Sequence, residues 1–134
     1  MKRTARVLVA MFLVLFLLAG PALAALPLIV GTNAPERITG TKNAEEIRGL
    51  GGSDEITDGL GGDLVYGGRG SDNLIGYGGD TSVDRFYGGR GNDIVQSRDV
   101  PAVKDVVSCG SGTDTVYADK AEVVGIDCER VKVW

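Results

Sequence analysis

The feature that most constrains this chain is a nine-residue repeat that begins at Gly31. Each row ends in a short apolar stretch, and rows 76–87 and 97–108 carry three-residue insertions after which the period resumes. A short fixed period is typical of solenoids, in which each repeat stacks on its neighbours. Glycine supplies 21 of the 134 residues, about twice its usual share, which argues against an ordinary helical or sandwich core. The apolar centres of the rows are Ile38, Ile47, Ile56, Val65, Leu74, Phe86, Val95, Val107 and Val116.

A carboxylate stands two residues before every one of these centres. The row starts are rich in glycine, which permits backbone conformations with positive φ and leaves carbonyl oxygens uncovered by side chains. Each well-formed row therefore places carboxylate and carbonyl oxygens close together. The row carboxylates are Glu36, Glu45, Asp54, Asp63, Asp72, Asp84, Asp93, Asp105 and Asp114.

The rows resemble the nonapeptide G-G-x-G-x-D-x-U-x, with U a large apolar residue, of the RTX (repeats-in-toxin), or hemolysin-type calcium-binding, family. GGRGSDNLI (67–75) and GGRGNDIVQ (88–96) match at every defined position, and three further rows match with one or two changes. The resemblance covers residues 31–117. It implies an all-β fold, a right-handed parallel β-roll (β-solenoid) in which two rows complete one turn, and Ca²⁺ as the ligand.

In such a roll the U residue points inward and its two neighbours point outward, because side chains alternate along a strand. Rows of the same parity lie on the same edge, about 4.8 Å apart. Asp54, Asp72, Asp93 and Asp114 then form a ladder on a first edge, and Asp63, Asp84 and Asp105 form a ladder on a second edge.

Calcium sites are expected between same-edge neighbours, because Ca²⁺ takes carboxylate and carbonyl oxygens together. The alternative is a metal-free solenoid in which the Asp side chains only accept hydrogen bonds from turn amides. The predicted carboxylate ligands are Asp54, Asp63, Asp72, Asp84, Asp93 and Asp114. The predicted glycines of the sites are Gly52, Gly61, Gly68, Gly70, Gly89 and Gly91.

Some rows depart from the motif. The first two rows have Glu36 and Glu45 in place of Asp and lack most of the glycines, so they are interpreted as a capping turn in which metal binding is in doubt. The two insertions are expected to weaken the sites of the second edge, most of all the one that involves Asp105.

Residues 1–24 have the composition of a secretory signal peptide: a basic start, about 13 apolar residues and the small-residue site Ala22-Leu23-Ala24. The apolar run is shorter than the roughly 20 residues of a membrane span, so no span is expected after cleavage. This segment carries three of the 14 basic residues and none of the 18 acidic ones, which leaves 11 against 18. The acidic remainder favours cations as partners and excludes nucleic acid.

The predicted organisation is a signal peptide (1–24), an N-terminal extension (25–30), the repeats (31–117) and a C-terminal cap (118–134). Two cysteines after a secretory signal allow one disulfide, Cys109 to Cys128, which would pin the cap across the end of the roll. The apolar cover of that end is expected from Val123, Val124, Ile126, Val131, Val133 and Trp134.

These features predict a secreted, extracellular calcium-binding protein (periplasmic if the cell has an outer membrane) that folds into a rigid roll when Ca²⁺ binds. The alternative is a calcium-stiffened surface or adhesion module that binds a protein or glycan through an outward sheet face, where Tyr66 and Tyr87 would stack. The protein is not expected to be an enzyme. The chain contains no histidine, which excludes Ser-His-Asp and Cys-His catalysis, and the repeat already accounts for the strong carboxylate pairs.

Overall fold

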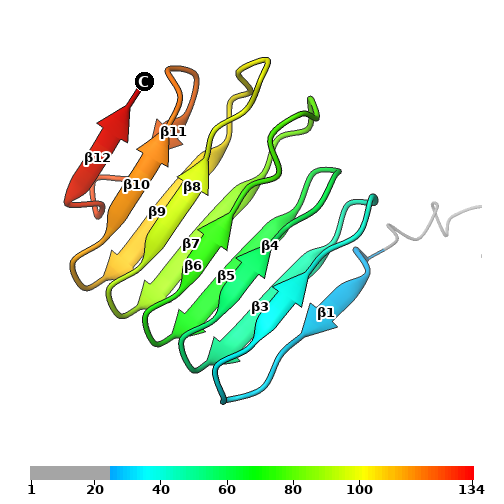
Figure 1. Cartoon of the computed structure of the whole chain (residues 1–134), viewed down its shortest axis with the longest axis vertical. Coiled ribbons are helices and arrows are strands. Elements are labelled where there is room, and N and C mark those ends of the chain that lie inside the picture. The colour runs from blue at the N-terminus through cyan, green and yellow to red at the C-terminus, as the bar shows by residue number, and fades with distance from the viewer. Residues whose placement is uncertain (1–24) are drawn as a thin grey trace, which may run out of the picture.

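The computed structural model describes residues 25–134 as a parallel β-solenoid of two six-stranded sheets whose turns stack in chain order (Figure 1). The predicted signal peptide (1–24) lies outside the described residues. One sheet contains β1 (Leu28–Val30), β3 (Glu46–Gly51), β5 (Leu64–Arg69), β7 (Arg85–Arg90), β9 (Val106–Ser111) and β11 (Val123–Val124). The other contains β2 (Arg37–Thr39), β4 (Glu55–Thr57), β6 (Asn73–Ile75), β8 (Ile94–Ser97), β10 (Thr115–Ala118) and β12 (Arg130–Val133). The predicted all-β parallel roll is confirmed.

The interior is the predicted stack of apolar centres. Val65 is in register with Phe86, and Phe86 with Val107, although each pair is 21 residues apart. The three-residue insertions therefore lengthen turns and leave the strand pairing unchanged. All nine centres are buried, from Ile38 at 9% exposed to Ile47, Ile56, Val65, Leu74, Phe86, Val95 and Val116 at 0%. Side chains on either side of each centre are more exposed, as the alternation along a strand requires.

One sheet has longer strands than the three-residue strands predicted. β3, β5, β7 and β9 each continue three residues into the next row. Gly68 pairs with Gly89, and both have positive φ, 112° and 113°. A Cβ on Gly89 would overlap the carbonyl oxygen of Gly68, so the close stacking requires glycine there. Leu50 occupies the equivalent position with φ 77°.

The C-terminal segment differs from the predicted cover. Instead of closing the end of the roll, β11 and β12 extend both sheets by one strand each. Val131 is in register with Val116 but is 43% exposed, because β12 is an edge strand of its sheet among residues 25–134. Val124 packs partly against the core. The other residues expected to form the cover are exposed: Val123, Ile126, Val133 and Trp134.

The predicted disulfide is confirmed. Cys109 and Cys128 are bonded with their Cα atoms 5.2 Å apart, and Cys109 is fully buried. The bond ties the segment before β12 to the end of β9, at the last turns of the roll.

Candidate metal centres

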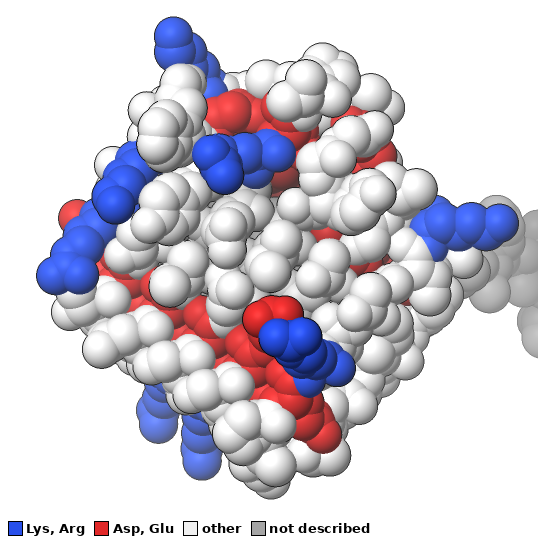
Figure 2. Space-filling view, viewed as in Figure 1, with Lys and Arg blue, Asp and Glu red and all other residues white. Residues whose placement is uncertain are grey.

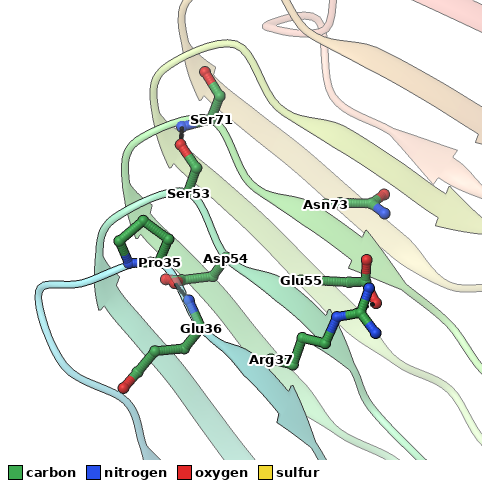
Figure 3. A pocket seen from close by; sticks show the side chains of 8 residues that line it. All are labelled: Pro35, Glu36, Arg37, Ser53, Asp54, Glu55, Ser71 and Asn73. Carbon is green, nitrogen blue, oxygen red and sulfur yellow. Dashed lines mark hydrogen bonds and ion pairs between the residues drawn. The ribbon is translucent and has the colours of Figure 1, made fainter.

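The first edge carries a continuous ladder of Asp side chains. The Oδ1 atom of each accepts a hydrogen bond from the backbone N–H of the carboxylate residue one turn earlier. The N···O distances are 2.9 Å from Glu36 to Asp54, 2.8 Å from Asp54 to Asp72, 2.9 Å from Asp72 to Asp93 and 2.7 Å from Asp93 to Asp114. Figure 3 shows the start of this ladder, with the Asp54 carboxylate against the backbone nitrogen of Glu36. The repeat thus aligns its acidic side chains along one line, and Figure 2 shows acidic atoms in a diagonal band that follows one edge of the roll.

The second oxygen of each ladder carboxylate has no hydrogen-bond partner. The Oδ2 atoms of Asp54, Asp72, Asp93 and Asp114 are all buried and unpaired. In rows 49–57, 67–75 and 88–96 this oxygen lies against the row's first glycine: a Cβ on Gly49, Gly67 or Gly88 would be 2.6, 2.6 or 2.5 Å from it. A buried carboxylate oxygen without a partner is costly. Amide hydrogen bonding, the basis of the metal-free alternative, accounts for only one of the two oxygens.

The six glycines assigned to the sites all adopt positive φ. The angles are 106° for Gly52, 101° for Gly61, 112° for Gly68, 122° for Gly70, 113° for Gly89 and 134° for Gly91. A Cβ on Gly70 would overlap the carbonyl oxygen of Gly52, and one on Gly91 would overlap that of Gly70. Glycine carbonyls of one turn therefore point toward the next turn along the first edge. Carbonyl and free carboxylate oxygens on one edge form a donor set suited to a hard cation such as Ca²⁺.

No basic side chain balances these carboxylates within residues 25–134, where the ion pairs are Arg37–Glu55 and Arg48–Glu46. Burial raises the pKa of Asp93 to about 6, and the charges of Asp72 and Asp114 add to the effect. Burial likewise raises the pKa of Asp72. The ladder is therefore short of positive charge.

The ladder extends further toward the C-terminus than predicted. The carboxylate of Glu129 accepts a hydrogen bond from the backbone N–H of Asp114 at 2.8 Å. In the same way, the carboxylate of Asp114 accepts the backbone N–H of Asp93. Glu129 stands two residues before the inward-pointing Val131, so it obeys the same carboxylate rule as the repeats. It was missed because the row spacing shortens after residue 117.

The N-terminal glutamates behave differently from the aspartates. Glu36 accepts the backbone N–H of Thr32 at 2.7 Å, and Glu45 accepts that of Thr41 at 2.7 Å, so each closes its own turn. Their longer side chains reach amides that an Asp would not. This arrangement agrees with the interpretation of these rows as a capping turn.

The second edge carries a ladder of the same kind. Asp63 accepts the backbone N–H of Glu45 at 2.7 Å, Asp84 that of Asp63 at 2.8 Å, and Asp105 that of Asp84 at 2.8 Å. The ladder is unbroken across both insertions. The two rows with insertions also carry Asp80 and Asp99, whose charges help to raise the pKa of Asp84.

Three aspartates meet on the second edge. One oxygen from each of Asp58, Asp63 and Asp84 lies within 4.8 Å of the others, and the residues are 0%, 0% and 4% exposed. Burial raises the pKa of Asp58 to about 8, with the charges of Asp84 and Asp63 adding to it. Burial also raises the pKa of Asp84 to about 7 and that of Asp63 to about 6.

Asp58 was not among the predicted ligands. It occupies the first position of its row, where the best-matching rows have glycine, so the motif assigns it no role as a ligand. The signal available in the sequence was an acidic residue in a glycine position.

The outward face contains the predicted aromatic pair. The rings of Tyr66 and Tyr87 stack with centroids 4.8 Å apart and planes 10° apart. Arg48, Leu50, Tyr66 and Gly68 line a shallow pocket on this face.

Residues 39–74, 48–83 and 58–95 each match a family model made of four copies of the RTX calcium-binding nonapeptide repeat. No curated protein and no solved structure matches the chain. Residues 25–134 contain no helix that is long and apolar enough to cross a membrane.

Proposed function

Because the chain carries RTX calcium-binding nonapeptide repeats, we propose that it binds several Ca²⁺ ions between neighbouring turns and folds into a rigid β-roll as they bind. One observation carries this proposal. Four buried Asp Oδ2 atoms on the first edge have no partner, and they stand on the edge where glycine carbonyls point from turn to turn.

The proposed sites lie between same-edge neighbours. On the first edge these are Asp54 with Asp72, Asp72 with Asp93, and Asp93 with Asp114, completed by carbonyls of Gly52, Gly68, Gly70, Gly89 and Gly91. On the second edge Asp63 pairs with Asp84, beside the turn of Gly61, and Asp84 pairs with Asp105. Bound Ca²⁺ would balance the negative charge of these carboxylates and give their unpaired oxygens a partner. Mg²⁺ is a poorer fit, because it demands a tighter octahedron and gives up water reluctantly.

Calcium binding and folding are coupled in this proposal. The core is one apolar side chain wide in each row, whereas ordering the backbone costs about 1–2 kcal/mol per residue and more at glycine. Aligned buried carboxylates add repulsion. Without a cation the roll is therefore disfavoured, and metal binding supplies the missing free energy.

The setting is proposed to be outside the cytoplasm. RTX repeats are typical of secreted proteins, and the Cys109–Cys128 disulfide indicates an oxidising compartment. In a calcium-rich medium the chain would act as a stiff structural or adhesive module, with no catalytic role.

The test is far-UV circular dichroism of residues 25–134, with the disulfide formed, during titration of metal-free protein with CaCl₂ or MgCl₂. A coil-to-β transition with Ca²⁺ and little change with Mg²⁺ is expected, and Asp72→Ala and Asp93→Ala should each weaken the response. A β spectrum already complete without metal would contradict the coupling.

A second function is favoured by the Tyr66–Tyr87 stack: binding of an extracellular protein or glycan to the outward sheet while Ca²⁺ only stiffens the scaffold. A Tyr66→Ser/Tyr87→Ser double variant tests it. Loss of partner binding with an unchanged calcium response would support this role, and unchanged binding to such a partner would contradict it.

A further inference from the structure

The geometry points to a ligand that the repeat motif does not contain: we propose that the carboxylate of Asp58 joins those of Asp63 and Asp84 in binding one Ca²⁺ ion on the second edge. This inference rests on the proposed function for the identity of the cation. It adds a ligand, Asp58, that stands where the motif has glycine.

The three carboxylates are held in place by the backbone. Oδ1 of Asp58 accepts a hydrogen bond from the backbone N–H of Tyr77 at 2.8 Å. Oδ1 of Asp63 accepts one from the N–H of Glu45, and Oδ1 of Asp84 accepts one from the N–H of Asp63. These amides come from three different turn segments, so the site is assembled by stacking of the roll. In the folded roll the backbone amides therefore fix the orientation of all three carboxylates.

The second oxygens provide the independent sign of a ligand. Oδ2 of Asp58 and Oδ2 of Asp63 have no hydrogen-bond partner although both residues are completely buried. Neither of the two ion pairs within residues 25–134 involves the three aspartates. Buried carboxylates are normally paired with a cation or coordinate a metal, and no basic side chain of residues 25–134 forms an ion pair with these three.

The spacing fits one ion. Two oxygens bound to the same Ca²⁺ at ~2.3–2.6 Å are at most about 5.2 Å apart. One oxygen from each aspartate already lies within 4.8 Å of the others. Three oxygens at this spacing are at most about 2.8 Å from a common point, so small side-chain shifts bring all three within the Ca²⁺–oxygen distance of a single ion.

The composition of this site differs from that of the first edge. There, the rows of Asp54, Asp72 and Asp93 begin with Gly49, Gly67 and Gly88, and the row's own Asp Oδ2 lies where a side chain at that position would start. In row 58–66 a carboxylate occupies that position instead. The second-edge ion would thus be held by three negative side chains, and its binding should depend on Asp58 while the first-edge sites do not.

Asp58→Gly tests this directly, because it restores the glycine of the motif and removes only the extra carboxylate. Bound Ca²⁺ per chain is counted by equilibrium dialysis and isothermal titration calorimetry. The variant is expected to bind one ion fewer than the parent, or to bind that ion at least tenfold more weakly. Glu55→Gln is the matched control, since it removes an acidic side chain that is 43% exposed and outside both ladders, and its count should not change.

Asp58→Asn keeps the shape of the side chain and the acceptor for Tyr77, so it serves if the glycine variant fails to fold. A site-resolved measurement accompanies both variants. Trace Mn²⁺ added to the Ca²⁺-loaded, ¹⁵N-labelled parent should broaden the amide signals of Tyr77, Glu45 and Asp63. The broadening should be lost in the Asp58 variants, while that of the first-edge amides of Asp54 and Asp72 remains.

The outcomes separate the two proposals. If the parent binds Ca²⁺ and the Asp58 variants bind the same number with unchanged affinity, the three-aspartate site is overturned and the proposed function stands. If the parent binds no Ca²⁺, the proposed function fails and this site fails with it. Loss of one ion in the Asp58 variants alone supports the site.

Discussion

Replacing Asp58 with Asn should make the metal-free roll more stable at pH 8 and leave its stability at pH 4 unchanged. Burial raises the pKa of Asp58 in the folded chain from 3.8 to about 8. A group whose pKa is raised by folding contributes its full stability below the unfolded pKa and loses it as the pH rises through the folded pKa. The metal-free parent is therefore most stable below about pH 4 and weakens up to about pH 8. Asn carries no charge, so the variant escapes this loss.

The size of the effect follows from the same pKa difference. At ~1.4 kcal/mol per pH unit, a rise from 3.8 to about 8 corresponds to roughly 5–6 kcal/mol at pH 8. This figure is an upper limit, because proton sharing with Asp63 and Asp84 and entry of water reduce it. The groups that act on Asp58 are those two carboxylates, which raise its pKa, and the backbone amides of Tyr77 and Gly59, which lower it.

The assay uses chelating-resin-treated protein, whose roll is disfavoured without Ca²⁺, and follows its folding by far-UV circular dichroism as the osmolyte sucrose is added at pH 4, 6 and 8. Parent and Asp58→Asn should fold at the same osmolyte concentration at pH 4 and diverge as the pH rises, with the variant folding at the lower concentration. Glu55→Gln should follow the parent at every pH. In saturating Ca²⁺ the advantage of Asp58→Asn should disappear or reverse. An equal difference at all three pH values, or a less stable variant at pH 8, would refute the reasoning.

Two further substitutions test the turns and the C-terminal end. Gly70→Ala should destabilise the Ca²⁺-loaded roll by more than ~2 kcal/mol in urea unfolding, because its φ is 122° and its Cβ would overlap the Gly52 carbonyl oxygen. Gly79→Ala is the control, with φ 129° and nothing within 4 Å, so its smaller loss isolates the backbone strain from the overlap. Replacing Cys109 and Cys128 by Ala should cost about 3 kcal/mol by removing a cross-link between residues 19 apart. An unchanged thermal midpoint in the double variant would show that the last turn holds without the bond.

Much of the fold was predictable because the repeat is local. The inward position of each row follows from the alternation of side chains in a strand, and Ile47, Val65 and Phe86 are buried as that rule requires. The two Asp ladders follow from the parity of the rows. The disulfide followed from the count of two cysteines.

The missed residues fail the motif for specific reasons. The motif gives Asp58 no role because Asp58 replaces a glycine, and its proximity to Asp84, 26 residues along the chain, depends on the stacking of the turns. Glu129 was missed because the row spacing shortens near the end of the chain. The apolar cover was wrong because the last residues pair as strands, and pairing takes Val131 to the open end of the stack.

The amino-acid sequence alone determined the period, the inward side chain of each row and the alignment of same-parity carboxylates, because these depend on repeat length and strand alternation. Only the tertiary structure decided which carboxylates from different turns converge, which oxygens remain unpaired, and where the two sheets stop. Those properties depend on how turns of unequal length stack along the same edge of the roll, and the pattern within a single row does not determine that stacking.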